Sequence, residues 1–278
     1  MPYIQYFVKN KMNPFKQISK LCLCLFAFYS SELLATSLYS SCAPEQTAKL
    51  IQELKLLTSK TLKSDELQER SDCIYLDANS LLIATANLIP NKENIYQIQL
   101  YLLNPNHKKI LFKYIHSQTI SEENGRFSSI KFDRVPYSSL PKENVVGLNT
   151  HHLNNGYFSY DLDTFNLFRV RSNPNSQKYN IQWVLRDIQT NIQTNWRPAY
   201  GCENGTNDDI KSIFILQNSQ NHQLQDMILK QIKKSEDTDE KCKTIHSKKT
   251  EQQLLKFNGE YYQINKKQLL TSEDIRDE

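Results

Sequence analysis

The sequence has little glycine and no catalytic or nucleotide-binding motif. Only 6 of its 278 residues are glycine, and loops that hold a phosphate against the backbone need glycine where the chain approaches closely. There is no GxSxG, HExxH, phosphate-binding glycine loop or dinucleotide fingerprint. The 25 asparagines are expected to form the turns instead, because asparagine tolerates positive φ better than most residues. These absences argue against a nucleotide-binding protein.

Long apolar runs are also missing, apart from one short stretch near the beginning. Leu21–Ala35 (LCLCLFAFYSSELLA) follows two lysines and opens with an apolar run. A basic flank, a short apolar core and a closing alanine are the parts of an export signal, whereas a spanning helix needs roughly 20 apolar residues. We therefore expect residues 1–35 to form an export signal, with the true start of the protein at Met12. The mature chain is then expected to be periplasmic or secreted. A membrane anchor and a lipoprotein attached through Cys42 are the alternatives.

The mature chain lacks an excess of charge of either sign. Residues 1–35 hold four lysines and one glutamate, so their removal leaves 30 basic and 29 acidic residues. A net charge of +1 provides no basic surface for nucleic acid. We expect no nucleic-acid partner and no transmembrane span in the mature chain.

Few cysteines remain after the signal, but their number is even. Two of the six lie in the signal, which leaves Cys42, Cys73, Cys202 and Cys242. Four cysteines in an exported chain indicate two disulfides, with three possible pairings. We favour Cys42–Cys73 with Cys202–Cys242, because each pair brackets one compact segment. No spacing is CxxC, which argues against a zinc or thioredoxin-type site, and we expect no metal and no other cofactor.

The periodicity of apolar residues predicts a mainly β fold, with antiparallel sheets in meander or hairpin order and one N-terminal helix packed on them. The helix is expected at about 44–63, since Pro44 suits the first helical position and apolar residues follow at helical spacing. Ser80–Leu88, Ile95–Leu103 and Lys109–Ile115 predict a three-strand meander. Further strands are expected at Phe127–Asp133, Val145–His152, Thr164–Arg171, Tyr179–Leu185 and Ile210–Leu216.

The C-terminal third is less regular. Leu224–Ile232 fits either a helix or a strand, and we favour a strand that pairs with 210–216. The mixed charges of residues 233–249 predict a solvated loop. Asn258-Gly259 between β-forming residues predicts a closing hairpin.

The expected organisation has three parts. After the signal at 1–35 comes a β-rich globular region over 36–267, followed by a polar tail over 268–278 that is expected to fray. A softer division of the globular region near 172–178 is an alternative, because SNPNSQK separates two expected strands.

Two pairs of side chains on one expected hairpin are candidates for chemistry. Asp161 and Asp163 share a face if that stretch is extended, whereas the adjacent His151 and His152 then point to opposite faces. One histidine with one of these carboxylates would form an acid/base or metal site across the hairpin. Turn-forming acids beside a strand are the alternative interpretation.

The same hairpin is crowded with aromatic rings. Exposed rings can bind sugars or peptides, and buried ones form cross-strand pairs in a core. Tyr157 and Tyr160 are the candidates for binding. The full set is Tyr157, Phe158, Tyr160, Phe165 and Phe168.

Several stretches resemble uncharacterised exported proteins of Gram-negative bacteria: the leader, LLIATANLIPNKENIYQIQLYLL, GLNTHHLNNGYFSYDLDTFNLF and LLKFNGEYYQI. The resemblance implies an envelope location and supplies no catalytic residue. We expect a non-enzymatic envelope protein that binds a protein partner, as an inhibitor, immunity protein or assembly factor. The alternatives are a small-molecule or glycan-binding module that uses the aromatic hairpin 157–168, and a cell-wall or glycan hydrolase that uses His151 or His152 with Asp161 or Asp163.

Overall fold

The computed structural model describes most of the chain after residue 38. Three features expected from the sequence, the export signal over 1–35, Tyr157 and Cys202, lie outside the described residues. The described ranges are 39–57, 64–92, 94–106, 108–121, 126–135, 137–138, 144–155, 158–173, 178–196, 206–239 and 241–271.

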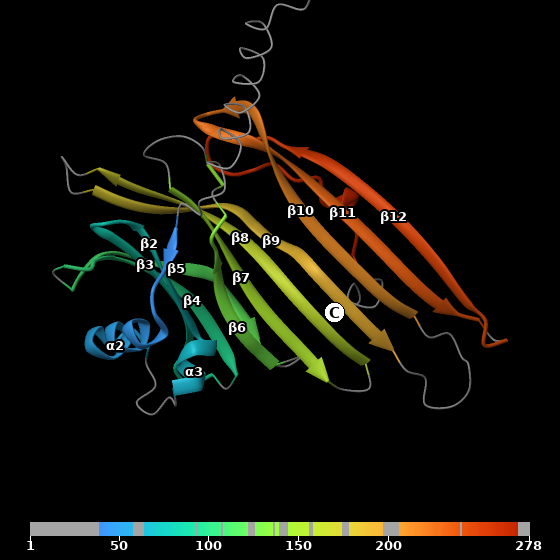
Figure 1. Ribbon diagram of the computed structural model, residues 1–278, viewed down its shortest axis with the longest axis horizontal. Coiled ribbons are helices and arrows are strands. Elements are labelled where there is room, and N and C mark those ends of the chain that lie inside the picture. Colours follow the sequence, from blue (N-terminus) through green and yellow to red (C-terminus); the bar gives the residue numbers. More distant parts are fainter. Residues whose placement is uncertain are drawn as a thin grey trace, which may run out of the picture. The chain divides into compact units, whose positions relative to one another are not determined.

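The fold is mainly β, as predicted, and consists of two antiparallel sheets (Figure 1). The first sheet has the order β1-β2-β3-β4-β5 and the second the order β12-β11-β10-β9-β8-β7-β6, so within each sheet the described strands pair in chain order, and the chain passes from one sheet to the other between β5 and β6. The strands of the first sheet are β1 Ser40–Ser41, β2 Ser71–Asp77, β3 Ser80–Leu88, β4 Ile95–Asn104 and β5 Lys109–Ser121. Those of the second are β6 Arg126–Asp133, β7 Asn144–Asn155, β8 Phe158–Asn173, β9 Lys178–Trp196, β10 Thr206–Asn221, β11 Leu224–Thr238 and β12 Thr244–Leu255.

The strands predicted from alternation are confirmed, and most are longer than predicted. Strands β3, β4 and β5 form the expected meander. Strand β11 pairs with β10 from Leu224 onwards, which settles the ambiguous segment as a strand. Strands β8 and β9 pair up to Asn173 and Lys178. The possible division of the globular region near 172–178 therefore falls between two paired strands of one sheet. Asn91 and Asn94 have positive φ, as expected for asparagine in turns.

The N-terminal helix begins as predicted but is shorter. Helix α2 spans Pro44–Leu54 and ends where Lys55 adopts a left-handed conformation, with φ of 52°. A second helix, α3, spans Ser64–Glu69, so the expectation of one helix reaching residue 63 is wrong. Leu50 and Ile51 of α2 pack with side chains of β2, β3 and β4, so the helix covers one face of the first sheet. Among the described residues, no helix is long and apolar enough to cross a membrane.

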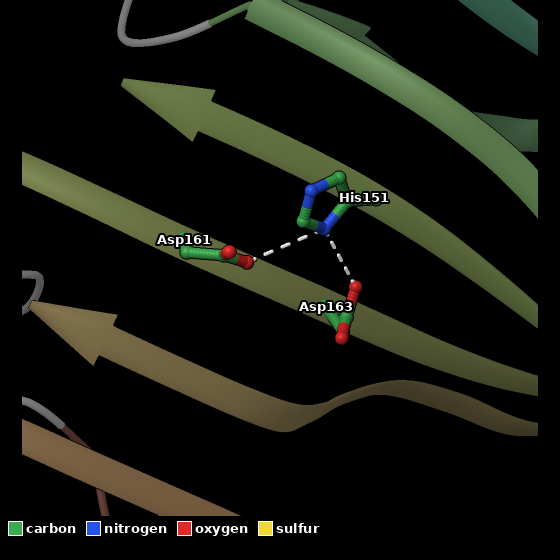
Figure 2. A group of neighbouring side chains, drawn as sticks. All are labelled: His151, Asp161 and Asp163. Atoms are coloured by element: carbon green, nitrogen blue, oxygen red, sulfur yellow. Dashed lines mark hydrogen bonds and ion pairs between the residues drawn. The ribbon is translucent and has the colours of Figure 1, made fainter. Parts of the chain in front are cut away.

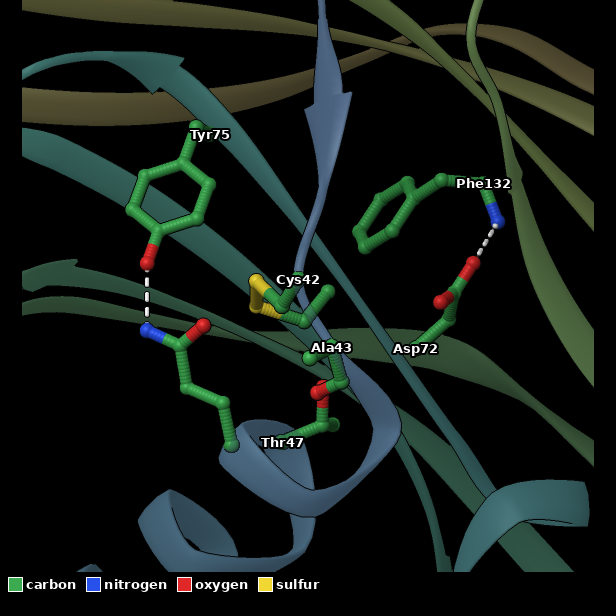
Figure 3. The surroundings of a disulfide bond; sticks show 8 residues. Cys42, Ala43, Thr47, Asp72, Tyr75 and Phe132 are labelled. Atoms are coloured by element: carbon green, nitrogen blue, oxygen red, sulfur yellow. Dashed lines mark hydrogen bonds between the residues drawn. A yellow bond between two sulfur atoms is a disulfide. The ribbon is translucent and has the colours of Figure 1, made fainter.

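The predicted Cys42–Cys73 disulfide is confirmed (Figure 3). It joins Cys42, two residues before α2, to strand β2, with the two Cα atoms 5.4 Å apart. The Sγ atom that a lipid anchor on Cys42 would need is therefore bonded to Cys73. Cys242 is also disulfide-bonded, and the partner expected for it, Cys202, lies outside the described residues.

Two main cores lie against the second sheet. The first fills the space between the sheets and includes Ile74 and Leu100 from one sheet with Val146 and Trp183 from the other. Val145 belongs to the second core. Because adjacent residues of a strand point to opposite faces, this core lies on the other face of the second sheet. It also contains side chains from β11 and from the segment after β12.

One expectation for the C-terminal third is wrong. Residues 233–249 are mostly strand, as the end of β11 and the start of β12, rather than a solvated loop. The predicted hairpin at Asn258-Gly259 is present but short: Phe257 and Tyr262 form an antiparallel bridge, the Asn258 N–H donates to Tyr261 O, and the Gln263 N–H donates to Lys256 O. The tail is held as far as Leu270, whose side chain is buried and whose N–H donates to Gln231 Oε1 at 2.9 Å.

Candidate functional site

Polar side chains form consecutive cross-strand rows on one face of β7 to β11. In one row Leu153, Asp161, Gln193, Asp209 and Lys234 are direct neighbours on five strands. Residues two apart on a strand share a face, so the neighbouring row lies beside this one. That row starts with His151 and Asp163, which face each other on β7 and β8.

His151, Asp161 and Asp163 form a compact trio on this face (Figure 2). His151 Nδ1 lies 2.8 Å from Asp163 Oδ1 and 3.3 Å from Asp161 Oδ1. One ligand atom from each residue lies within 4.8 Å of the other two. The side chains are 25%, 36% and 31% exposed in that order, so the trio is reachable from solvent but only partly hydrated.

One nitrogen cannot satisfy both carboxylates of the trio. The Nδ1 atom carries at most one proton, and the shorter contact assigns its hydrogen bond to Asp163. Asp161 Oδ1 is then a buried oxygen without a hydrogen-bond partner among the described residues. A carboxylate oxygen that is removed from water and accepts no hydrogen bond lowers the stability of the folded chain. The trio therefore brings two carboxylates to a single hydrogen-bond donor.

His152 points to the other face and does not join the trio. It lies beside the Phe127 ring, at 5.7 Å between centroids, and lines a cavity of about 280 Å³ with His116 and Asp187 among others. Burial, followed by the nearby His151, lowers the pKa of His152 from 6.5 to about 4. Of the two sequence candidates, the structure therefore brings only His151 to the carboxylates.

A polar groove of about 640 Å³ lies beside the trio and shares Asp161 with it. Its described lining includes four carboxylates, of Asp161, Asp208, Asp209 and Glu236, and one ammonium, of Lys234. Asn207 Oδ1 and Asp209 Oδ1 are buried oxygens without a hydrogen-bond partner in the described part of the chain. The groove is therefore acidic and rich in hydrogen-bond acceptors.

Asp208 is the one of these carboxylates that is compensated internally. Its side chain is 1% exposed, with Oδ2 lying 2.7 Å from Lys233 Nζ and Oδ1 accepting from Ser235 Oγ at 2.6 Å. Asp209 has only a looser contact of 3.7 Å with Lys211 Nζ. Asp161, Asp209 and Glu236 thus give the groove its net negative charge.

Sequence reasoning missed the half of the groove that lies on β9, β10 and β11. The strand expected at Ile210–Leu216 did not include residues 206–209, which begin β10. Glu236 and Asp237 were expected in a solvated loop because of the mixed charges around them, and they lie on β11. The only available signal was the spacing of Asp209 from Lys211, which places both on one face of a strand.

The aromatic residues of the hairpin divide between the cores and the site. Phe165 and Phe168 are buried in the two cores described above, so they are structural. Tyr160 is half-buried and is among the residues that line the groove. Tyr157 lies outside the described residues.

Comparison with known proteins assigns the chain to no family. No protein-family model, no curated protein and no solved structure matches it.

Proposed function

We propose that this chain is an exported binding protein in which His151, Asp161 and Asp163 hold a divalent cation. The observation that carries the proposal is the convergence of three potential ligand atoms from two neighbouring strands, all within 4.8 Å of one another. Export is supported by the composition of residues 1–35, and also by the Cys42–Cys73 disulfide, since disulfides persist in oxidising compartments.

The separations within the trio suit a shared ion. Two ligands about 2.1 Å from one cation, at octahedral or tetrahedral angles, lie roughly 3.0–3.4 Å from each other. The two nitrogen–oxygen separations in the trio are 2.8 and 3.3 Å. A cation would replace the proton on His151 Nδ1 and would also be a positive partner for Asp161 Oδ1, which has no hydrogen bond within the described part of the chain.

The donor set indicates a first-row divalent metal. One imidazole nitrogen with two carboxylates suits Zn²⁺ or Mn²⁺ better than Ca²⁺, which prefers oxygen ligands alone. Because the trio is partly exposed, such an ion would retain open coordination positions toward solvent and the groove. These positions are where a bound ligand would meet the ion.

A hydrolase is the second candidate, favoured by the bond between His151 and Asp163. A histidine whose Nδ1–H is held by a carboxylate presents its other nitrogen as a general base. Hydrolysis of a cell-wall or glycan substrate that is lost in D163N, while the folded variant keeps its cation, would favour this second function.

Calorimetric titration of the mature chain with Zn²⁺ and Mn²⁺ tests the proposal. We expect one ion per chain, with affinity reduced at least about tenfold in H151Q and D163N, since removing even an outer partner of a metal ligand costs about that much. H152Q is the matched control, because the neighbouring histidine points to the other face, and its affinity should be unchanged. Equal effects of H151Q and H152Q, or no saturable binding, would overturn the proposal.

A further inference from the structure

Strand β12 forms one edge of the seven-stranded sheet, and its outer side is open. It pairs with β11 over its whole length, Thr244–Leu255, without a register shift. In the described part of the chain no further strand pairs with β12, which is the outermost strand of the sheet in Figure 1. Alternate backbone N–H and C=O groups of an edge strand point away from the sheet. An open edge of this length can therefore pair with another extended strand.

The strand also exposes apolar side chains that its own sheet does not cover. Ile245 is 50% exposed and Leu254 is 49% exposed. Neither proline nor glycine interrupts the strand sequence, TIHSKKTEQQLL, although proline is a common protection of an edge against pairing. Lys248 and Lys249 do discourage pairing with an arbitrary strand, because they bring charge to the edge. A strand that pairs here therefore has to supply opposite charge.

We infer that a second copy of this chain pairs at this edge, with the two β12 strands antiparallel across a two-fold axis at Thr250. This dimer goes beyond the cation held by the trio and does not depend on it. A two-fold axis perpendicular to the sheet keeps each face on the same side in both copies. Because successive side chains alternate between faces, a residue can then lie opposite only itself or a residue an even number of positions away.

With the axis at Thr250, the charges near the centre of the strand complement each other. Lys249 of each copy lies opposite Glu251 of the other, and the two copies of Thr250 face each other. Within one chain Lys249 and Glu251 already lie on one face, with Nζ 3.4 Å from Oε1, so positive and negative charges alternate around the axis. Opposite charges and threonine pairs that face each other across strands are both favourable.

The same register also covers the exposed apolar side chains. Ile245 lies opposite Leu255 of the second copy, and Leu255 is a buried member of the second core. Leu254 lies opposite His246, whose ring can cover part of it. Residues 245–255 of the two copies pair through roughly ten backbone hydrogen bonds, and a typical protein interface carries about ten in total.

The neighbouring registers are disfavoured by charge. An axis at Lys249 sets two lysines directly opposite each other, and an axis at Lys248 does the same. An axis at Glu251 sets two glutamates opposite each other. Like charges directly opposite on paired strands are destabilising, and axes nearer the ends of β12 pair fewer residues. The sequence of β12 therefore selects the axis at Thr250.

Sedimentation equilibrium of the mature chain, with a chelator present, tests the dimer. K249E and E251K should each weaken dimerisation about tenfold, because each sets like charges opposite one another at two places in the interface. The double variant K249E/E251K exchanges the charges and should restore dimerisation. K248E makes the same charge change on the same strand and is the matched control, since Lys248 lies opposite the neutral Gln252, and it should dimerise like the wild type.

Cysteine cross-linking tests the register. Across the axis the two Cα atoms of residue 250 lie about 5 Å apart, which is within the range of about 4.4–6.8 Å that a disulfide spans, so T250C should form a covalent dimer on oxidation. Residue 248 lies on the same face, but its two copies are four residues out of register and about 14 Å apart, so K248C should stay monomeric without reductant. Cys42, Cys73 and Cys242 are already disulfide-bonded.

Three outcomes would overturn the inference. They are a monomer at every concentration, a dimer that neither K249E nor E251K weakens, and a cross-link through K248C instead of T250C. A charge variant that does not fold leaves T250C, in which all charges are kept, as the deciding test. Failure of Zn²⁺ to bind the trio leaves each expected result unchanged, because the chelator removes the ion.

Discussion

The Cys42–Cys73 disulfide closes a loop of 31 residues, and its removal should cost a large part of the stability of the chain. In the chain-entropy model a loop of this length is worth about 3.7 kcal/mol, against a total of about 5–15 kcal/mol for a typical domain. Both cysteines are buried against Leu50 and Ile51 of α2. Loss of the bond should therefore destabilise the attachment of the helix as well as the whole chain.

Urea denaturation of the wild type and of C42A/C73A measures this effect. We expect the midpoint to fall by roughly 1–2 M, given an m value of about 2–3 kcal/mol/M, and the m value to rise as the unfolded chain expands. C42S/C73S replaces the sulfur atoms by hydroxyls and should lose the same cross-link contribution, so any difference between the variants reports packing and polar burial. A midpoint within about 0.3 M of the wild type in both variants, with m unchanged, would refute the reasoning.

Two further predictions concern the second sheet. The folded pKa of His152, about 4, lies below the unfolded value of 6.5, so the unfolded chain alone gains this proton as the pH falls between them. The free energy of unfolding should be retained above pH 6.5 and fall by about 3 kcal/mol on acidification to pH 4. Urea midpoints measured across this range should decline less steeply with falling pH in H152Q than in the wild type. Equal declines in the two proteins would contradict a lowered pKa of His152. A Cβ at Gly147 would lie 2.5 Å from Phe165 Cε2 and 3.0 Å from Asp133 Cβ, so G147A should lower the free energy of unfolding by about 1–3 kcal/mol, and an unchanged thermal midpoint would show that the Phe165 ring moves aside freely.

Strands with a run or a regular alternation of apolar residues could be predicted from the sequence, whereas strands made mostly of polar residues could not. Ser80–Leu88 was predicted with its observed bounds because it is a nearly continuous apolar run that is buried along most of its length. Strand β12 carries almost no apolar residues and is exposed over most of its length, so its sequence resembles a solvated loop. Its backbone pairs with β11 over Thr244–Leu255, and among these residues only Leu255 has a buried side chain.

The candidate site could be predicted only in part for a related reason. Successive side chains of a strand point to opposite faces, and side chains two residues apart share a face. This made one histidine with Asp161 or Asp163 a candidate pair. The pairing register that sets His151 opposite Asp163 depends on the whole sheet and is not encoded locally. The groove depends on Asp209 and Glu236 from later strands, whose long-range pairing no local pattern predicts.

Imidazole ¹⁵N spectra recorded during a Zn²⁺ titration show whether the trio binds a cation through His151 Nδ1. At one equivalent of Zn²⁺ we expect the Nδ1 resonance of His151, assigned by its loss in H151Q, to shift strongly while that of His152 stays in place. Because Asp163 is expected to hold the same ion, D163N should need more Zn²⁺ to saturate this shift. An unmoved His151 resonance at saturation, or a shift that appears on His152 instead, would contradict the account.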